Sequence, residues 1–157
     1  MSAASFKKTV LDAMAGALKG NGFKKRASVL SREVGDVVQL VSLQSSQQST
    51  SDCIRVTVNI AVCIPRLLQD GLPSVWDGHW HKRIGDFAAV PADRWWTIAS
   101  AENAAQAASE ICETLEASVV PTLQSLSSSS ALLQLWRSGQ SPGITKGQAS
   151  RLIEALR

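Results

Sequence analysis

The chain has 157 residues, of which 45% are hydrophobic, and this length and composition suit one domain with its own core. Its three cysteines include no Cys-x-x-Cys pair, so a disulfide framework is not expected and a reducing compartment is favoured. No apolar run approaches the roughly 20 residues that a membrane-spanning helix requires, and the first residues do not resemble a signal peptide. We therefore predict one cytoplasmic domain, residues 1–157, that is not embedded in a membrane.

The net charge is +3, but positive and negative residues are separated along the chain. Lysine and arginine predominate in the first 26 residues, whereas the glutamates between positions 102 and 116 have no lysine or arginine among them. This separation predicts a basic end and an acidic helix. The basic residues 24–26 follow a predicted helix end and lack interleaved aromatic residues, so nucleic-acid binding is not expected.

The first half of the chain predicts one helix and several strands. Apolar residues recur at helical spacing over 6–19, with Ser5 as the expected N-cap. Residues 28–34 and 37–43 have strand composition and are separated by a Gly-Asp turn, which indicates a hairpin. Residues 54–64 alternate between apolar and mostly polar side chains, so we expect a strand with one buried face and a second face open to water or a ligand.

The second half predicts a tryptophan-containing loop, two short strands and then helices. The loop covers 66–81, and the strands cover 83–90 and 94–98. Ser100 is the expected N-cap of an alanine-rich helix, Pro121 kinks or restarts that helix, and Thr145 with Gln148 forms a capping-box pattern before the last helix. We therefore predict an α+β fold, an antiparallel sheet of about four to five strands packed against an N-terminal helix and C-terminal helices within 101–157.

Several short pieces in a particular order resemble one protein family. These pieces are Gly22-Phe23-Lys24-Lys25, Gly35-Asp36-Val37-Val38-Gln39, Leu43-Gln44-Ser45-Ser46, Val56-Thr57-Val58-Asn59-Ile60, Arg83-Ile84-Gly85 and Asp93-Arg94-Trp95-Trp96. Over roughly residues 5–137 the chain is similar to the mostly bacterial domain of unknown function 4304 family. The resemblance implies an α+β domain of bacterial origin and brings no established activity. Ser45 stands where that family is expected to have a lysine or arginine, which weakens an anion-binding role for this turn.

Arginines, amides and tryptophans form the candidate ligand site. Arginine makes bidentate hydrogen bonds to carboxylate or phosphate, so arginines near the polar strand face suggest recognition of an acidic or phosphorylated ligand. Their simpler role is pairing with nearby aspartates, namely Asp52, Asp86 or Asp93. Adjacent tryptophans in a strand point to opposite faces, so one should be buried and the other exposed or covered by Trp76, Trp80 or a C-terminal helix. The candidate residues are Gln44, Arg55, Asn59, Arg83, Arg94, Trp95 and Trp96.

His79 and His81 are the candidates for metal binding or catalysis, because both rings would share one face of an extended segment. Zinc sites use three or four protein ligands, and the sequence has no HExxH motif, paired Cys-x-x-Cys, phosphate-binding loop or nucleophile elbow. We therefore predict no metal or cofactor and favour a non-catalytic domain that binds another protein or a small molecule. The alternative is a hydrolase or nuclease that uses these histidines with a nearby carboxylate. The oligomeric state and the identity of the ligand stay open.

Overall fold

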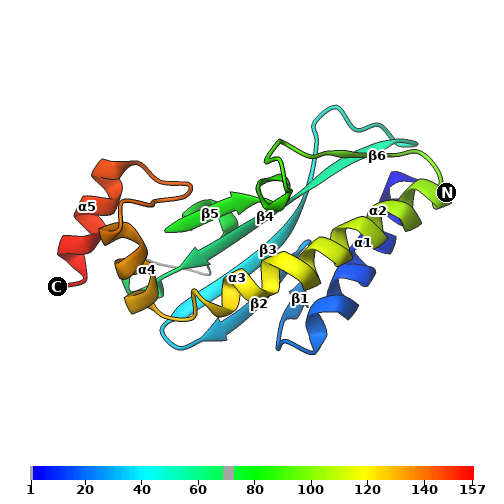
Figure 1. Cartoon of the computed structure of the whole chain (residues 1–157). Helices are drawn as coiled ribbons and strands as arrows, with labels where there is room; N and C mark the ends of the chain where they lie inside the picture. Colours follow the sequence, from blue (N-terminus) through cyan, green and yellow to red (C-terminus); the bar gives the residue numbers. More distant parts are fainter. Residues whose placement is uncertain (1, 69–72) are drawn as a thin grey trace.

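A computed structural model describes residues 2–68 and 73–157, and part of the predicted 66–81 loop, residues 69–72, lies outside the described residues. Within these ranges six strands form one antiparallel sheet, which confirms the predicted α+β class with one strand more than expected (Figure 1). The strands are β1 (Lys24–Arg26), β2 (Val29–Val34), β3 (Val37–Ser45), β4 (Ile54–Cys63), β5 (Trp80–Arg83) and β6 (Trp96–Ile98).

The long strand β4 organises the sheet. The strand order is β1-β2-β3-β4-β5, and β6 pairs with β4 on the same edge as β5. Strand β5 pairs with residues 59–62 of β4, whereas β6 pairs with residues 54–56. The hydroxyl of Thr57, between these two stretches, donates to the Arg94 carbonyl at 2.7 Å and holds the approach to β6 in place. The end of β5 and the segment before β6 therefore lie near each other along one edge of β4.

Helix α1 (Ala3–Lys19) packs on one face of the sheet through Phe6, Val10, Met14 and Leu18. Its N-cap is Ser2, whose side chain accepts a hydrogen bond from the Ser5 amide, so the expected cap at Ser5 is wrong. The apolar repeat marks where the helix is buried, whereas the alanines before it extend the helix further without needing burial.

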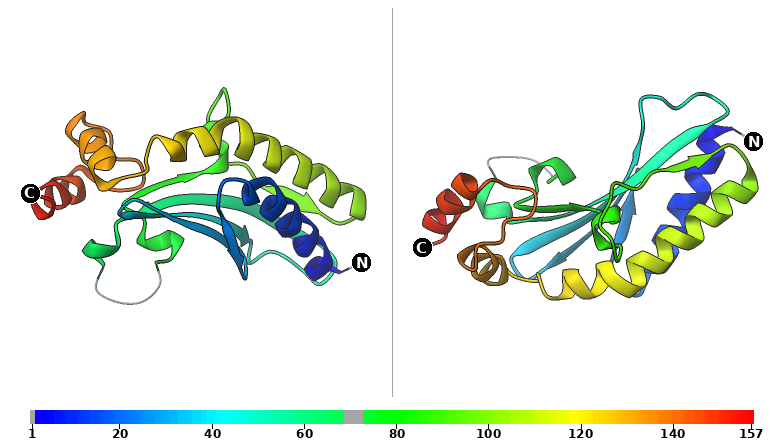
Figure 2. Two further views of the ribbon diagram at one scale, coloured as in Figure 1. Left: turned by 90° about the horizontal axis from the view of Figure 1, so that it is seen from below. Right: turned by 45° about the horizontal axis from the view of Figure 1, so that its top comes forward.

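A second long helical segment lies beside α1 on the same face of the sheet (Figure 2). It comprises α2 (Ala101–Thr114), a π-helical turn (Leu115–Val119) and α3 (Val120–Gln124). Ser100 caps α2 by accepting from the Asn103 amide, as predicted. Alanines 104, 107 and 108 are buried, so this helix approaches its neighbours closely. Together α1, α2 and the facing side chains of β3 and β4 form the main core.

The chain ends in α4 (Ser129–Arg137) and α5 (Lys146–Ala155), which lie beyond the end of the sheet distant from the N-terminus (Figure 1). Asp36, in the β2–β3 turn, accepts hydrogen bonds from the amide and the hydroxyl of Ser129 at the start of α4. Thr145 and Gln148 form the predicted capping box of α5. No helix in the described ranges has the length and hydrophobicity needed to cross a bilayer.

The predicted strand at 83–90 is wrong, because β5 ends at Arg83 and a 3-10 turn, Ile84–Phe87, follows it. The Asp86 carboxylate accepts from the Arg83 amide at 3.0 Å, and the Gly85 carbonyl accepts from the amides of Ala88 and Ala92. These local bonds use backbone groups that a strand would have offered to a neighbour, so the chain turns back on itself.

The second face of β4 is not the open polar surface that the sequence indicated. Ala61 and Cys63 pack with Val38, Leu40 and Val75 in a small second apolar cluster. Val75 belongs to a 3-10 turn, Val75–Asp77, that covers this part of the sheet. Packing of Leu68 and of the Val75–Asp77 turn therefore buries this end of the face, and the other end is where a ligand could reach it.

The polar residues in the middle of that face are also buried, since Thr57 and Asn59 have no exposed surface. Arg55 is only partly buried. The part of the predicted ligand surface that solvent can reach therefore lies around Arg55, at the start of β4.

Candidate functional site

Two arginine side chains lie over the ring of Trp95. The guanidinium carbons of Arg55, on β4, and Arg83, at the end of β5, lie 5.6 and 5.5 Å from the centre of the indole. Trp95 is partly buried whereas Trp96 is buried, as the strand alternation predicted. The two arginines flank Trp95 in place of the tryptophans or C-terminal helix considered from sequence. Cations are attracted to the electron-rich face of an indole, so this arrangement holds the ring in place.

Asp93 joins Trp95 to Arg83. Its carboxylate accepts from the Trp95 indole N–H at 3.0 Å and from Nη1 of Arg83 at 3.0 and 3.1 Å. These hydrogen bonds, first that of Trp95 and then that of Arg83, lower the pKa of the Asp93 carboxyl below its ordinary value. Arg83 is therefore neutralised by Asp93, which is one of the aspartate pairings that the sequence suggested.

Arg55 has a different environment. Its Nη1 donates to the side-chain oxygen of Gln48 at 2.8 Å, and among the described residues no carboxylate lies within ion-pair distance of it. An amide oxygen satisfies one of the five donors of a guanidinium and leaves its positive charge uncompensated. Arg55 is thus the arginine of the candidate set with capacity to bind an anion.

A chain of hydrogen bonds through the buried Asn59 fixes Gln44 next to Arg55. The side-chain amide of Asn59 donates to the Gln44 oxygen at 2.7 Å, and the oxygen of Asn59 lies 3.1 Å from Nε2 of His81. Since Asn59 is fully buried, it acts on a ligand in this region through the side chain of Gln44 that it positions. The sequence predicted that both amides belong to one ligand site. In the structure Gln44 lines the surface, whereas Asn59 holds the side chain of Gln44 in position.

The Trp95 groove is the hollow of about 520 Å³ lined by Arg55, Trp95 and the end of β3 with the loop that follows. The residues contributed by β3 and its loop are Gln44, Ser45, Ser46, Gln47 and Gln48. The lining contains amides, hydroxyls, an aromatic ring and one uncompensated guanidinium, and it contains no carboxylate. Such a surface can hydrogen-bond a polar ligand and attract a negative charge.

Arg94 and Trp96 lie away from the Trp95 groove, because both are bound to Glu110 on α2. Nη2 of Arg94 lies 3.1 Å from Oε2 of Glu110, and the Trp96 indole donates to the same oxygen at 2.6 Å. The Trp96 hydrogen bond is the largest cause, ahead of Arg94, that lowers the pKa of the Glu110 carboxyl. The sequence showed Glu110 only as part of an acidic helix, and no local pattern linked it to residues far away along the chain.

His79 and His81 both form hydrogen bonds within the protein, His79 with a backbone amide and His81 with the side chain of Asn59. Nδ1 of the buried His79 accepts from the Ile64 amide at 2.9 Å, and burial lowers the pKa of this ring. Burial followed by the Arg83 charge also lowers the pKa of His81. In the part of the chain that the structure describes, neither ring hydrogen-bonds to a carboxylate, and no group of three His, Cys, Asp or Glu side chains could hold a metal ion.

The fold and the site define an α+β domain in which helices cover one face of an antiparallel sheet and a polar groove opens near one end of the other face. The chain belongs to the family described as "Domain of unknown function (DUF4304)", whose model matches residues 14–125. This match confirms the family resemblance noted in the sequence. No curated protein and no solved structure matches the chain. Helices α4 and α5 follow the matched region.

Proposed function

We propose that this protein is a non-catalytic binding domain that takes a small ligand with a carboxylate or phosphate group in the Trp95 groove. The observation that carries the proposal is the state of Arg55, whose charge no described carboxylate neutralises and whose guanidinium lies over Trp95 at the edge of the hollow. A bacterial source and a cytoplasmic location, both expected from the sequence, belong to this proposal as well.

On binding, Arg55 would replace its hydrogen bond to Gln48 with stronger hydrogen bonds to the anionic group of the ligand. Gln48, which is exposed in the β3–β4 loop, holds Arg55 through a neutral acceptor. A carboxylate or phosphate can accept two hydrogen bonds from the guanidinium fork, and charge-assisted hydrogen bonds are about twice as strong as neutral ones. Gln44 and the loop hydroxyls supply further hydrogen bonds, and the indole supplies a flat apolar surface.

The alternative of a hydrolase or nuclease has less support. Nδ1 of His79 is already used as an acceptor, so a neutral His79 carries its proton on Nε2 and offers no free lone pair to act as a base. The ring of His81 is held by Asn59 rather than by a carboxylate that would orient a catalytic histidine.

The proposal is tested by titrating the ¹⁵N-labelled protein with sodium phosphate and, separately, sodium acetate, each against sodium chloride of the same ionic strength. We expect saturable shifts of the Arg55 side-chain signal and of the amide signals of Gln44 and Gln48. In Arg55→Gln the affinity should fall about tenfold or more, because a charged hydrogen bond is worth about 1.5–3 kcal/mol.

Arg94→Gln is the matched control, since Arg94 is an exposed arginine bound to Glu110 outside the Trp95 groove. Its anion affinity should equal that of the wild type. Shifts that chloride reproduces, or equal anion affinities of the wild type and Arg55→Gln, would contradict the proposal.

A further inference from the structure

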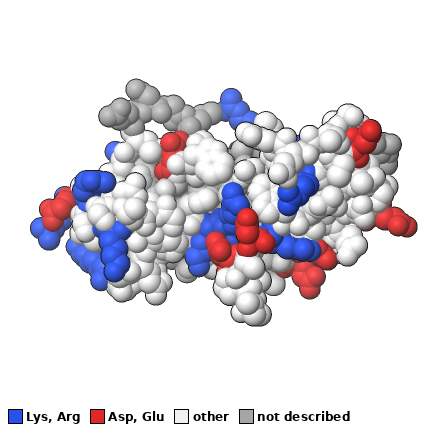
Figure 3. All heavy atoms as spheres, turned by 90° about the horizontal axis from the view of Figure 1, so that it is seen from above, with Lys and Arg blue, Asp and Glu red and all other residues white. Residues whose placement is uncertain are grey.

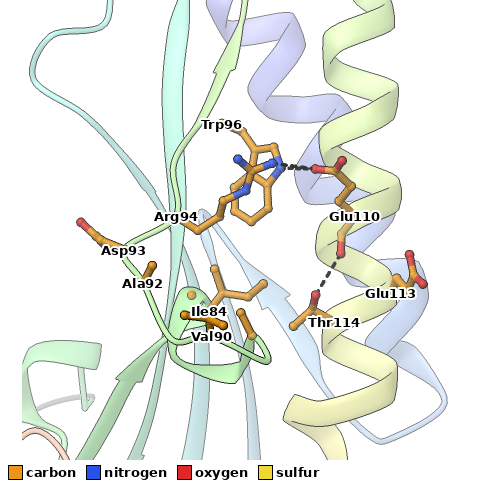
Figure 4. Close-up of a pocket in the computed structure, with 11 residues that line it drawn as sticks. Ile84, Val90, Ala92, Asp93, Arg94, Trp96, Glu110, Glu113 and Thr114 are labelled. Carbon is orange, nitrogen blue, oxygen red and sulfur yellow. Dashed lines mark hydrogen bonds and ion pairs between the residues drawn. The ribbon is translucent and has the colours of Figure 1, made fainter.

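A second hollow lies between α2 and the segment that connects β5 to β6, and we call it the α2 pocket (Figure 4). It has a volume of about 460 Å³. Ile84, Ala88, Val90 and Ala92 supply apolar surface. The charged lining residues are Glu110 and Glu113 on α2, and Asp93 and Arg94 before β6. Its size exceeds that of one large side chain, and its lining differs from the polar Trp95 groove.

The loop between β5 and β6 exposes the apolar part of the α2 pocket to solvent, and backbone hydrogen bonds close the base of this loop. Val90 is 81% exposed, which is the highest value among the large hydrophobic residues in the described ranges. The Gly85 carbonyl accepts the amides of Ala88 at 3.3 Å and Ala92 at 3.2 Å, so the loop is closed at its base. Val90 does not stand alone, because Ile84, Ala88 and Ala92 line the same hollow, and contiguous apolar surface with a polar rim is typical of contact sites.

The helix wall of the α2 pocket is negative. Glu110 is held by Arg94 and Trp96, whereas Glu113 forms no ion pair with the lysines and arginines that the structure describes. The lining of the α2 pocket carries three carboxylates, Asp93, Glu110 and Glu113, and one cation, Arg94, which pairs with Glu110, so negative charge is in excess. In the view of Figure 3, acidic and basic atoms lie together near the middle of the molecule, whereas basic atoms predominate at the end formed by the C-terminal helices.

We infer that the α2 pocket docks a segment of another protein that carries an arginine or lysine beside an aliphatic residue. The aliphatic stem of a basic side chain lies along apolar surface while its charged end reaches a carboxylate. Here the stem would lie against Ala88, Val90 and Ala92, and the charge would meet Glu113. An acidic segment does not fit as the occupant, because it would face Glu113 and a lining in which carboxylates outnumber the single cation Arg94.

The inference is independent of the Trp95 groove, which lies on the other side of residues 93–96 and is suited to anions. The two hollows share no lining residue. Arg55→Gln is therefore expected to leave binding in the α2 pocket unchanged, and the two proposals can fail separately.

The probe is n-butylguanidinium chloride, which carries the charged end and the whole aliphatic stem of an arginine. It is titrated into the ¹⁵N-labelled protein, with n-butanol, guanidinium chloride and sodium butyrate as separate comparison titrations. We expect saturable shifts of the amides of Ala88, Ala92 and Thr114 and of the Trp96 indole, with tighter binding of n-butylguanidinium than of any comparison compound.

Variants separate charge from apolar contact. Glu113→Gln should weaken binding of n-butylguanidinium about two- to fivefold, the range of an exposed ion pair. Val90→Ser should weaken it as well, and Glu116→Gln, which removes another exposed glutamate outside the α2 pocket, should not. All three positions are exposed, so these variants are expected to fold.

Three results would overturn the inference. The first is equal binding of butyrate and n-butylguanidinium, and the second is equal affinity of Glu113→Gln and Glu116→Gln. The third comes from sedimentation velocity: self-association of the wild type that Glu113→Gln abolishes would make the occupant a second copy of this chain instead of another protein.

Discussion

Gln39 shows how one buried polar residue can join distant parts of the chain. It has no exposed surface, and its side-chain oxygen accepts from Nε and Nη2 of Arg32 at 2.9 and 2.7 Å. Its side-chain nitrogen donates to the carbonyls of Leu123 at 2.6 Å and Leu126 at 3.2 Å. The carbonyls at the end of α3 are thereby satisfied by the β2–β3 hairpin, and every hydrogen bond of this buried amide is used.

Gly85 is required where the loop between β5 and β6 closes. A Cβ atom at this position would lie 1.8 Å from the Ala92 carbonyl oxygen, which belongs to the backbone and cannot rotate away. We predict that Gly85→Ala lowers the free energy of unfolding by about 1–3 kcal/mol or more, the cost of overpacking.

At Gly16 the substitution by alanine is expected to stabilise the protein, in contrast to Gly85. It lies within α1 and is exposed, and a Cβ atom there would meet no described atom within 4 Å beyond the backbone of its own helix. Gly16→Ala should raise the free energy of unfolding by about 0.5–1 kcal/mol, because alanine is the better helix former. Urea unfolding of both variants checks the two signs, and a neutral effect of Gly85→Ala would contradict the closed loop.

At the scale of elements, Pro121 does not break the long helical segment because a π-helical turn precedes it. The Val120 amide donates to the Leu115 carbonyl, five residues earlier, instead of to the carbonyl four residues earlier. This shift alters the backbone where a proline ring would otherwise collide with the preceding turn. The sequence indicated a kink or restart at Pro121, and the structure shows the helix continuing as α3.

A carboxylate in a distant turn holds the start of helix α4. Asp36 binds both the amide and the hydroxyl of Ser129. We predict that Asp36→Ala increases hydrogen exchange of the backbone amides in α4 and α5 by roughly tenfold, the effect of losing about 1.5 kcal/mol of local stability. The measurement is hydrogen exchange by mass spectrometry.

Glu33 supplies the matched control, because it is exposed on β2 of the same hairpin and has no ion-pair partner among the described residues. Glu33→Ala should leave exchange in α4 and α5 unchanged. Equal exchange in both variants would show that the core residues Leu132 and Trp136 hold α4 without help from Asp36.

Across the whole molecule, several acidic groups and two histidines link folding to pH in the same direction. Hydrogen bonds from Ser129 lower the pKa of Asp36, and those described above lower the pKa of Asp93 and Glu110. Burial lowers the pKa of His79 and His81. In each case the unfolded chain binds protons more readily than the folded chain, so stability falls as pH decreases.

The expected pH profile has two parts. Between about pH 6.5 and 5 the histidines lower stability as the unfolded state becomes protonated, and below about pH 4.5 the three carboxylates add a further decrease, following the ordinary pKa values of these groups. Urea midpoints measured from pH 8 to pH 3 test this profile. In Asp36→Asn the decrease below pH 4.5 should be smaller, and a constant midpoint from pH 7 to 5 would contradict the histidine contribution.

Local pattern by itself determined the α+β class, the strand at 54–64, the caps at Ser100 and Thr145 and the opposite environments of Trp95 and Trp96. These features depend on periodicity and on hydrogen bonds between residues three apart, both of which are visible in sequence. The grouping of Gln44 with Arg55 and Trp95 could also be predicted, because all three lie in or next to predicted strands of one sheet.

Tertiary structure decided which of these residues solvent can reach and which charges are neutralised. The burial of Asn59 under packed neighbours, the pairing of Arg94 with Glu110 and the uncompensated state of Arg55 all depend on groups brought together from separate elements. Such contacts leave no periodic trace in the chain, because side-chain burial and ion pairing depend on distance in space rather than on spacing in sequence.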